Sequence, residues 1–165
     1  MTEPPPSGAL VGREHRLPVR VYYEDTDFTG VVYHATYLRY LERGRTEFLR
    51  AVGVHHSELL GADDPTAFVV TRMNLRWLKS ARVDDALIVI TAYEVARGPR
   101  VSVTQSVRRG PDLLVSAEVE AACITPDGRA KRPPRILAEA VRPYLLADPP
   151  SGRQGPATRP QARSR

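Results

Sequence analysis

Three carboxylates, Glu24, Asp25 and Asp27, lie within four positions, shortly before a segment that has the residue spacing of a helix. Packing three negative charges together costs free energy, and a helix N-terminus lowers that cost because its free N–H groups carry partial positive charge. A carboxylate beside such N–H groups provides a nucleophile or base next to an oxyanion hole. A carbonyl substrate would lie between the two, and Tyr23 and His34 are near enough in the sequence to assist.

Two other interpretations fit the same residues. The simpler one is a solvated acidic loop that caps the following helix. The other is a calcium loop, because Asp25, Asp27 and Thr29 match the first ligand positions of an EF-hand. That match fails where Thr36 replaces the required bidentate Glu, and a strand is predicted before the loop. We therefore expect no metal site.

Hydrophobic spacing predicts the elements that position this loop. Apolar and polar residues alternate towards the end of the segment 15–23, which indicates a strand. From His34 onward the apolar residues recur every three or four positions, which predicts an amphipathic helix of about five turns that ends at Gly53. Gly44 inside this helix costs ~1 kcal/mol relative to Ala, unless close packing against a sheet requires the missing side chain.

The chain after this helix is rich in strands. A short helical segment is predicted at Ser57–Leu60, and residues 133–146 are expected to add a small closing element. Short Gly-Pro turns connect the last three strands, which therefore form an antiparallel meander. The strands are predicted at Ala67–Trp77, Ala86–Ala96, Arg100–Arg109 and Leu113–Ile124. One long helix can cover one face, so the predicted class is α+β, with a five-stranded curved antiparallel sheet wrapped around that helix.

The net charge of +5 and pI near 9.7 are unevenly distributed along the 165 residues. Residues 147–165 carry four Arg and one Asp, a local net of +3, and we expect a disordered Arg/Pro-rich tail there. Residues 1–13 are neutral and proline-rich, and are expected to form a flexible N-terminal end. The predicted domain, 14–146, keeps about +2 of the charge. Nucleic-acid binding would rest on the pI alone, and we do not expect it.

The composition also limits the cellular setting. A single Cys excludes a disulfide framework and a cysteine-based zinc site. No apolar run approaches the ~18 residues that a bilayer span requires, and the start lacks the pattern of a signal peptide. We therefore expect a soluble cytoplasmic protein with no membrane span.

The acidic loop and its flanks also carry a specific pattern. An Arg-Val strand end is followed by Thr-Asp, two free residues, Gly-Val-Val, an aromatic-His pair and a further Tyr. In this chain these are Arg20-Val21, Thr26-Asp27, Gly30-Val31-Val32, Tyr33-His34 and Tyr37. The pattern resembles that of the hot-dog-fold acyl-CoA thioesterases, in particular the Tol-Pal-associated (YbgC-type) subgroup and, more distantly, 4-hydroxybenzoyl-CoA thioesterase. The resemblance extends over about residues 17–141, and Thr36 and Gly44 depart from it.

The resemblance implies a hot-dog fold and hydrolysis of acyl thioesters of CoA or of an acyl carrier protein. It assigns Asp27 as the catalytic carboxylate, acting as nucleophile or as general base. It assigns the oxyanion donor to the backbone N–H of His34, beside Ala35 at the helix start. The side chains of His34 and Tyr23 match additional catalytic positions of the subgroup. Some hot-dog thioesterases use a helix carboxylate instead, for which Glu42 and Glu47 are the candidates. A thioester is activated and thiolate leaves readily, so we expect no cofactor.

The resemblance also implies a homodimer or homotetramer with active sites at the subunit interface. One helix cannot cover such a sheet, and an exposed strand edge invites pairing, which supports the same expectation. Residues expected to contact the substrate, including the phosphates of CoA, are Gly30, Val31, Arg72, Arg76 and Arg100. The alternative function is a non-catalytic acyl-thioester-binding or envelope-assembly accessory protein on the same fold, in which Asp27 is inert.

Overall fold

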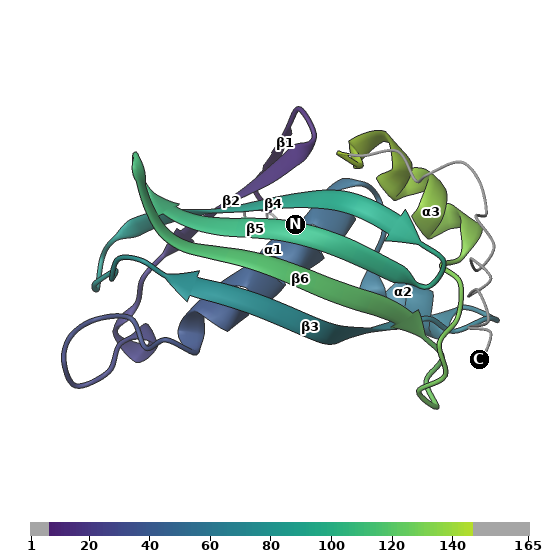
Figure 1. Cartoon of the computed structure of the whole chain (residues 1–165), viewed down its shortest axis with the longest axis horizontal. Helices are drawn as coiled ribbons and strands as arrows, with labels where there is room; N and C mark the ends of the chain where they lie inside the picture. Colours follow the sequence, from purple (N-terminus) through teal and green to yellow (C-terminus); the bar gives the residue numbers. More distant parts are fainter. Residues whose placement is uncertain (1–6, 147–165) are drawn as a thin grey trace, which may run out of the picture.

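The computed structural model describes residues 7–146 of the chain. Its strands form one antiparallel sheet in the order β1-β2-β4-β5-β6-β3, with the helix α1 against one face (Figure 1). The strands are β1 (Ala9–Val11), β2 (Glu14–Arg20), β3 (Ala67–Trp77), β4 (Ala86–Arg97), β5 (Arg100–Arg109) and β6 (Asp112–Ile124). The helices are α1 (Thr36–Ala51), α2 (His56–Gly61) and α3 (Arg135–Val141), with 3₁₀ turns η1 (Tyr23–Asp25) and η2 (Arg142–Tyr144).

The expectation of five strands was wrong, because the sheet of the described residues has six. The additional strand, β1, lies within the end predicted to be flexible, so that prediction was also wrong for Ala9–Val11. Gly12 adopts a φ of +62° in the turn that folds β1 back onto β2, a conformation that glycine accepts without a steric penalty. Residues 1–6 and the predicted tail at 147–165 lie outside the described residues.

Helix α1 confirms the predicted amphipathic helix and its end. It begins at Thr36, two residues after His34, and its buried face runs from Tyr37 to Leu49. Gly53 follows the helix with a φ of +81°, and the N–H groups of Gly53 and Val54 donate to the carbonyls of Arg50 and Leu49. This is the Schellman arrangement, which satisfies carbonyls at a helix C-terminus and favours glycine at that position.

Gly44 is the point of closest approach between α1 and the sheet. A Cβ added there would lie 2.7 Å from Thr91 Oγ1 and 2.8 Å from Val89 Cγ1. Beside it, the buried amide of Gln105 donates to the Leu41 carbonyl at 2.8 Å and accepts from the Arg45 guanidinium at 2.7 Å. Close packing of α1 on the sheet therefore explains the glycine at position 44.

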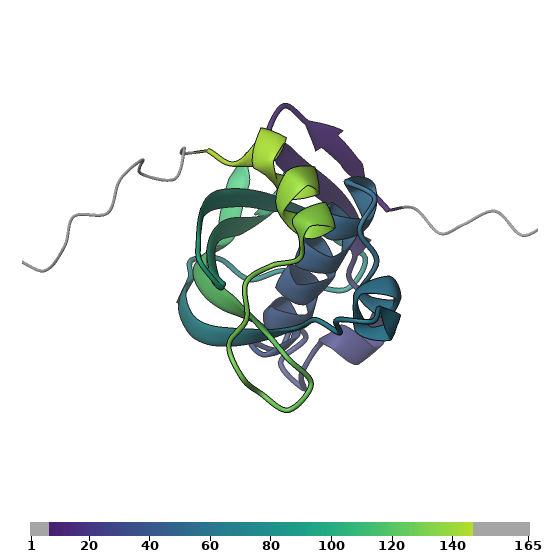
Figure 2. The same cartoon turned by 90° about the vertical axis from the view of Figure 1, so that its right-hand side faces the viewer.

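The sheet curves around α1, as Figure 2 shows from the end of the molecule where α3 lies. Strands β4, β5 and β6 form the predicted meander, and apolar side chains on their inner face pack against α1. α2 confirms the predicted short helix, and α3 with η2 supplies the closing element. The architecture is the hot-dog fold that the resemblance implied. None of the helices within residues 7–146 is both long enough and apolar enough to cross a membrane.

Candidate active site

The three carboxylates of the acidic loop have different environments. Asp25 is buried, and its Oδ2 accepts a hydrogen bond from the Tyr22 N–H at 2.8 Å. Its backbone carbonyl accepts from the Tyr33 N–H at 2.9 Å, which joins η1 to the start of α1. Glu24 is exposed to solvent. Asp25 therefore stabilises the loop, and Asp27 is the carboxylate that faces a cleft.

Asp27 lies in a tight turn that is closed by two backbone hydrogen bonds. Its N–H donates to the Val31 carbonyl and its carbonyl accepts from the Gly30 N–H, both at 3.0 Å. Gly30 has a φ of +76°, which explains the glycine of the motif. The Thr29 hydroxyl and N–H both donate to Asp27 Oδ1, at 2.5 and 2.8 Å. These two hydrogen bonds, with the nearby His34 ring, hold the pKa of Asp27 below its ordinary value, so the carboxylate is ionised at neutral pH.

The start of α1 presents free N–H donors next to Asp27. Ala35 is the N-cap residue and no side chain caps the helix. Neither His34 nor Ala35 donates its backbone N–H to any protein group in the described part of the chain. The His34 ring packs against Tyr33 with centroids 4.3 Å apart and meets the Trp77 ring edge-on at 6.1 Å. Because the Trp77 indole N–H donates to the His34 carbonyl at 3.3 Å, the helix start is held in place from β3.

The connection between β3 and β4 forms the opposite wall of the cleft. The Ala81 carbonyl accepts from the Val32 N–H at 2.8 Å, and the Ala81 N–H donates to the Tyr37 hydroxyl at 3.0 Å. These contacts join the wall both to the acidic loop and to α1.

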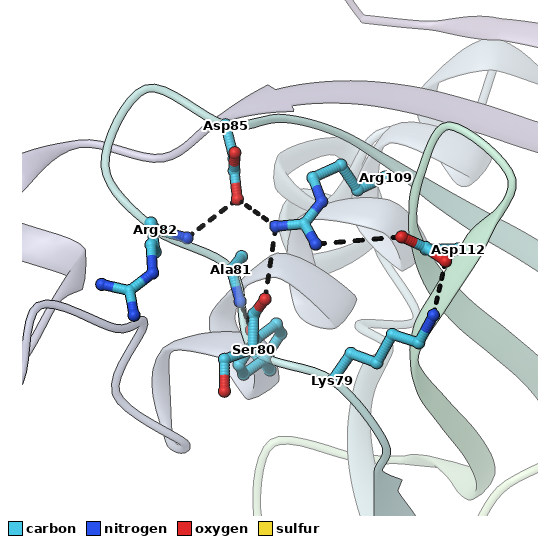
Figure 3. A network of polar contacts seen from close by, with 8 residues as sticks. Lys79, Ser80, Ala81, Arg82, Asp85, Arg109 and Asp112 are labelled. Carbon is cyan, nitrogen blue, oxygen red and sulfur yellow. Dashed lines mark hydrogen bonds and ion pairs between the residues drawn. The ribbon is translucent and has the colours of Figure 1, made fainter.

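Arg109 of β5 anchors the same wall (Figure 3). Its guanidinium donates to Asp85 Oδ2 at 2.7 Å and to the Ser80 carbonyl at 3.3 Å. Asp85 also accepts the Arg82 N–H, and Lys79 pairs with Asp112 at 2.5 Å. The Arg82 N–H and then the Arg109 guanidinium lower the pKa of Asp85, which therefore stays ionised as the partner of both.

These elements enclose a cleft of about 310 Å³. Asp27 and His34 face it from the acidic loop and the helix start, and Lys79 and Ser80 add polar groups from the β3–β4 connection. The lining residues are Asp27, Val31, Val32, His34, Tyr37, Trp77, Leu78, Lys79 and Ser80. An ionised carboxylate across a cleft from free N–H donors can attack an acyl carbonyl whose oxygen the donors stabilise.

The structure brings only some of the predicted site residues together. Asp27, His34 and Val31 line the cleft, with Gly30 and Ala35 adjacent in the chain. The Tyr23 side chain is 85% exposed and does not line it. Arg72 and Arg76 are exposed on β3, where Arg72 lies 3.9 Å from Glu120, and Arg100 lines a different cavity. In the single chain these three arginines do not form one site with Asp27.

Sequence reasoning missed several residues of the cleft. The sequence suggests Thr29 only as a calcium ligand, and no motif indicates Trp77, Lys79 or Ser80 as residues of the cleft. Lys79 and Ser80 stand about fifty positions from Asp27, so no local pattern connects them. Within residues 7–146, no group of three or more His, Cys, Asp and Glu side chains is arranged to hold a metal ion.

Proteins that resemble this chain in sequence and in structure are thioesterases. The thioesterase superfamily profile matches residues 29–116. The acyl-CoA thioester hydrolase YbgC of Escherichia coli O157:H7 is 41% identical over 127 residues, which cover 76% of this chain and 91% of that protein. The acyl-CoA thioesterase YbgC of Haemophilus influenzae is 42% identical over 108 residues, which cover 66% of this chain and 79% of that protein. A crystal structure of a probable thioesterase from Bartonella henselae superposes with a TM-score of 0.72 at 39% identity. The match covers 73% of this chain and 99% of that chain. The chain therefore belongs to the thioesterase superfamily.

Proposed function

We propose that this protein hydrolyses acyl-CoA thioesters in the cleft between the acidic loop and the start of α1. The observation that carries the proposal is that the ionised Asp27 carboxylate and the free N–H groups of His34 and Ala35 adjoin one cleft. The YbgC relatives, whose names specify acyl-CoA thioesters, support the choice of substrate. The acyl carbonyl would lie between carboxylate and donors, and the positive end of α1 would stabilise the oxyanion.

Both Thr29 hydrogen bonds go to Oδ1 of Asp27 and leave Oδ2 free, and we propose that Asp27 acts as the nucleophile. In this mechanism an Asp27 oxygen forms a bond to the thioester carbon, and the C–S bond breaks with its electron pair moving to sulfur. The CoA thiolate then takes a proton from solvent. Water attacks the Asp27 carbonyl carbon of the resulting anhydride, which releases the free acid and regenerates a carboxylate that carries one oxygen from water. A single turnover in ¹⁸O-labelled water tests this, because only nucleophilic catalysis introduces the label into Asp27.

Thiol release from a panel of acyl-CoA and acyl-carrier-protein thioesters tests the function itself. We expect Asp27→Asn to lower kcat by about 10²- to 10⁴-fold, the range of a positioned catalytic group, while the fold is retained. The matched control is Glu24→Gln, which removes the same charge from an exposed position in the same loop and should leave kcat unchanged. Mass spectrometry of the Asp27→Asn protein excludes deamidation back to Asp. Wild-type turnover by intact Asp27→Asn would overturn the site. No thiol from any wild-type reaction would favour the non-catalytic binding protein.

We also propose that the protein acts as a homo-oligomer. The eleven-residue strand β3 is an edge of the sheet, and Val69, Val70 and Trp77 on it are exposed. A long edge strand with exposed apolar side chains favours pairing with another chain. Light scattering of the purified protein should give the mass of a dimer or tetramer, and a monomer at micromolar concentration would contradict this. A cytoplasmic location, a Tol-Pal association and acyl-carrier-protein substrates remain predictions.

A further inference from the structure

A second cavity, of about 200 Å³, lies beneath α3 at the far end of α1 from Asp27. Its wall combines the end of α1, the β4–β5 turn, β6 and the closing helix. Side chains that form the wall include Leu49, Tyr93, Val101, Cys123, Leu137 and Val141. None of the residues that line this cavity lines the Asp27 cleft, so the two are separate places in the fold.

The interior of this cavity suits an aliphatic group. Tyr93, Cys123 and Leu137 are buried, and the Tyr93 ring stacks on Phe48 with centroids 4.3 Å apart, so the wall is preformed. An ordered water needs two to four polar partners, which a wall of such side chains does not supply. Removing methylene groups from water into such a space is favourable.

Two arginine side chains are part of the lining of this otherwise apolar cavity. Arg100 is the first residue of β5 and Arg142 belongs to η2, and both are exposed. Neither forms an ion pair with any acidic side chain of residues 7–146, and no Asp or Glu lines the cavity. A complementary ligand therefore combines an apolar chain with an anionic head.

We propose that this cavity binds a fatty acid, with its alkyl chain beneath α3 and its carboxylate held by Arg100 and Arg142. A carboxylate matches the two-pronged donor geometry of a guanidinium. The chain's own C-terminal segment, residues 147–165, is a poorer occupant, because it carries four Arg against one Asp and almost no large apolar residue. The proposal is independent of thioester hydrolysis, and its tests do not use that activity.

Calorimetric titration of the full chain with butanoate, octanoate and decanoate, all below their micelle concentrations, measures the proposed binding. We expect affinity to rise with chain length and to fall with added salt. Octanol, which lacks the anion, should bind about fivefold more weakly than octanoate. Equal affinities for octanol and octanoate would overturn the role of the arginines. Binding of the protein to anionic phospholipid vesicles, but not to monomeric acids, would instead assign the site to a lipid surface.

Substitutions of residues that line the cavity test whether octanoate binds there. Arg100→Gln and Arg142→Gln should each weaken octanoate binding by about fivefold, the effect of one ion pair near water. Arg132→Gln removes the same charge from an exposed residue outside the lining and should have no effect. Ala138 of α3 lines the cavity but is itself exposed, so Ala138→Leu should reduce octanoate binding without lowering Tm. Unchanged affinity in all three lining variants would contradict the proposal.

The only cysteine of the chain provides an independent probe of occupancy. Cys123 lines the cavity, and burial raises the pKa of its thiol to about 11, so alkylation is slow. Octanoate should slow the alkylation of Cys123 by N-ethylmaleimide further, in proportion to the fraction bound, both in the wild type and in Asp27→Asn. If octanoate binds but gives no protection, or if Asp27→Asn alone abolishes the binding, the acid occupies the catalytic cleft and the proposal fails.

Discussion

Thr29 holds the Asp27 carboxylate by a single oxygen. Its hydroxyl and its backbone N–H both donate to Oδ1, at 2.5 and 2.8 Å. Oδ2 accepts no hydrogen bond from the described part of the chain, and so remains available to a substrate. These two hydrogen bonds orient Oδ2, the oxygen that we propose attacks the substrate, and also stabilise the charged form of the carboxylate.

Replacing Thr29 by Val should move the acid limb of the kcat/KM profile to higher pH. The variant loses the hydroxyl but keeps the backbone N–H, so the pKa of Asp27 rises part of the way towards the ordinary value of about 3.9. Near neutral pH Asp27 stays ionised in both proteins. Profiles between about pH 3 and pH 7 measure the shift, and Thr29→Ser, which retains a hydroxyl, is the control. An acid limb at the same pH in Thr29→Val and wild type would show that Asp27 does not set it.

Trp77→Phe should lower kcat by about fivefold, the net value of one hydrogen bond, because it removes the donor to the His34 carbonyl and keeps an aromatic ring. Initial rates with one acyl-CoA measure this effect. Trp77 is the only tryptophan and lines the cleft, so CoA should change the emission of the wild-type protein. An emission that saturating CoA leaves unchanged would place the ligand elsewhere.

Gly44→Ala should destabilise the fold by about 1 kcal/mol. The gain in helix propensity, ~1 kcal/mol, is outweighed because the added Cβ would approach Thr91 and Val89 to within 3 Å, and overpacking costs about 1–3 kcal/mol. Thermal unfolding measures the effect, as a decrease in Tm of about 4 °C. Gly61→Ala is the control, because a Cβ there meets nothing within 4 Å and Tm should not fall. A more stable Gly44→Ala protein would mean that the helix shifts at no cost.

Arg109→Gln should loosen the cleft wall, raise KM and lower the free energy of unfolding, because it removes the partner of Asp85 and of the Ser80 carbonyl. The folded-state pKa of Asp85 is lowered, so its contribution to stability is present above about pH 3.9 and lost as the pH falls below that. The stability difference from wild type should therefore shrink at pH 3. Urea unfolding at pH 7 and pH 3 measures it. Arg108→Gln, the neighbouring residue without an ion pair among residues 7–146, is the control. Equal losses for both variants would indicate a general charge effect.

Local patterns predicted the long elements closely. The strands β3 and β5 have the bounds expected from alternation and turn residues, and the stop of α1 at Gly53 follows from the conformation of that glycine. The short strand β1 was not predicted, because three residues carry no periodicity and their conformation depends on pairing with β2. Its formation is a tertiary effect.

The candidate site also contains some residues that the sequence could identify and others that it could not. Asp27 and His34 could be identified because they lie in one loop at one helix start, within the reach of a motif. Lys79, Ser80 and Trp77 could not, because the sheet brings the β3–β4 connection to that loop from about fifty residues away. Tyr23 is only four residues from Asp27 in the sequence, but in the single chain its side chain faces solvent.

The sequence by itself determined the order of the long elements, the place of Asp27 before α1 and the family to which the chain belongs. Periodicity, turn residues and motif spacing act over a few residues, so they can be read directly from the chain. Only the tertiary structure decided which of the three carboxylates faces the cleft, what forms its far wall and where the arginines lie. Burial and hydrogen-bond partners depend on chain segments that are distant in sequence and meet only after folding. The same folding separates Arg100 from Asp27 and places it with Arg142 at an apolar cavity at the other end of the molecule.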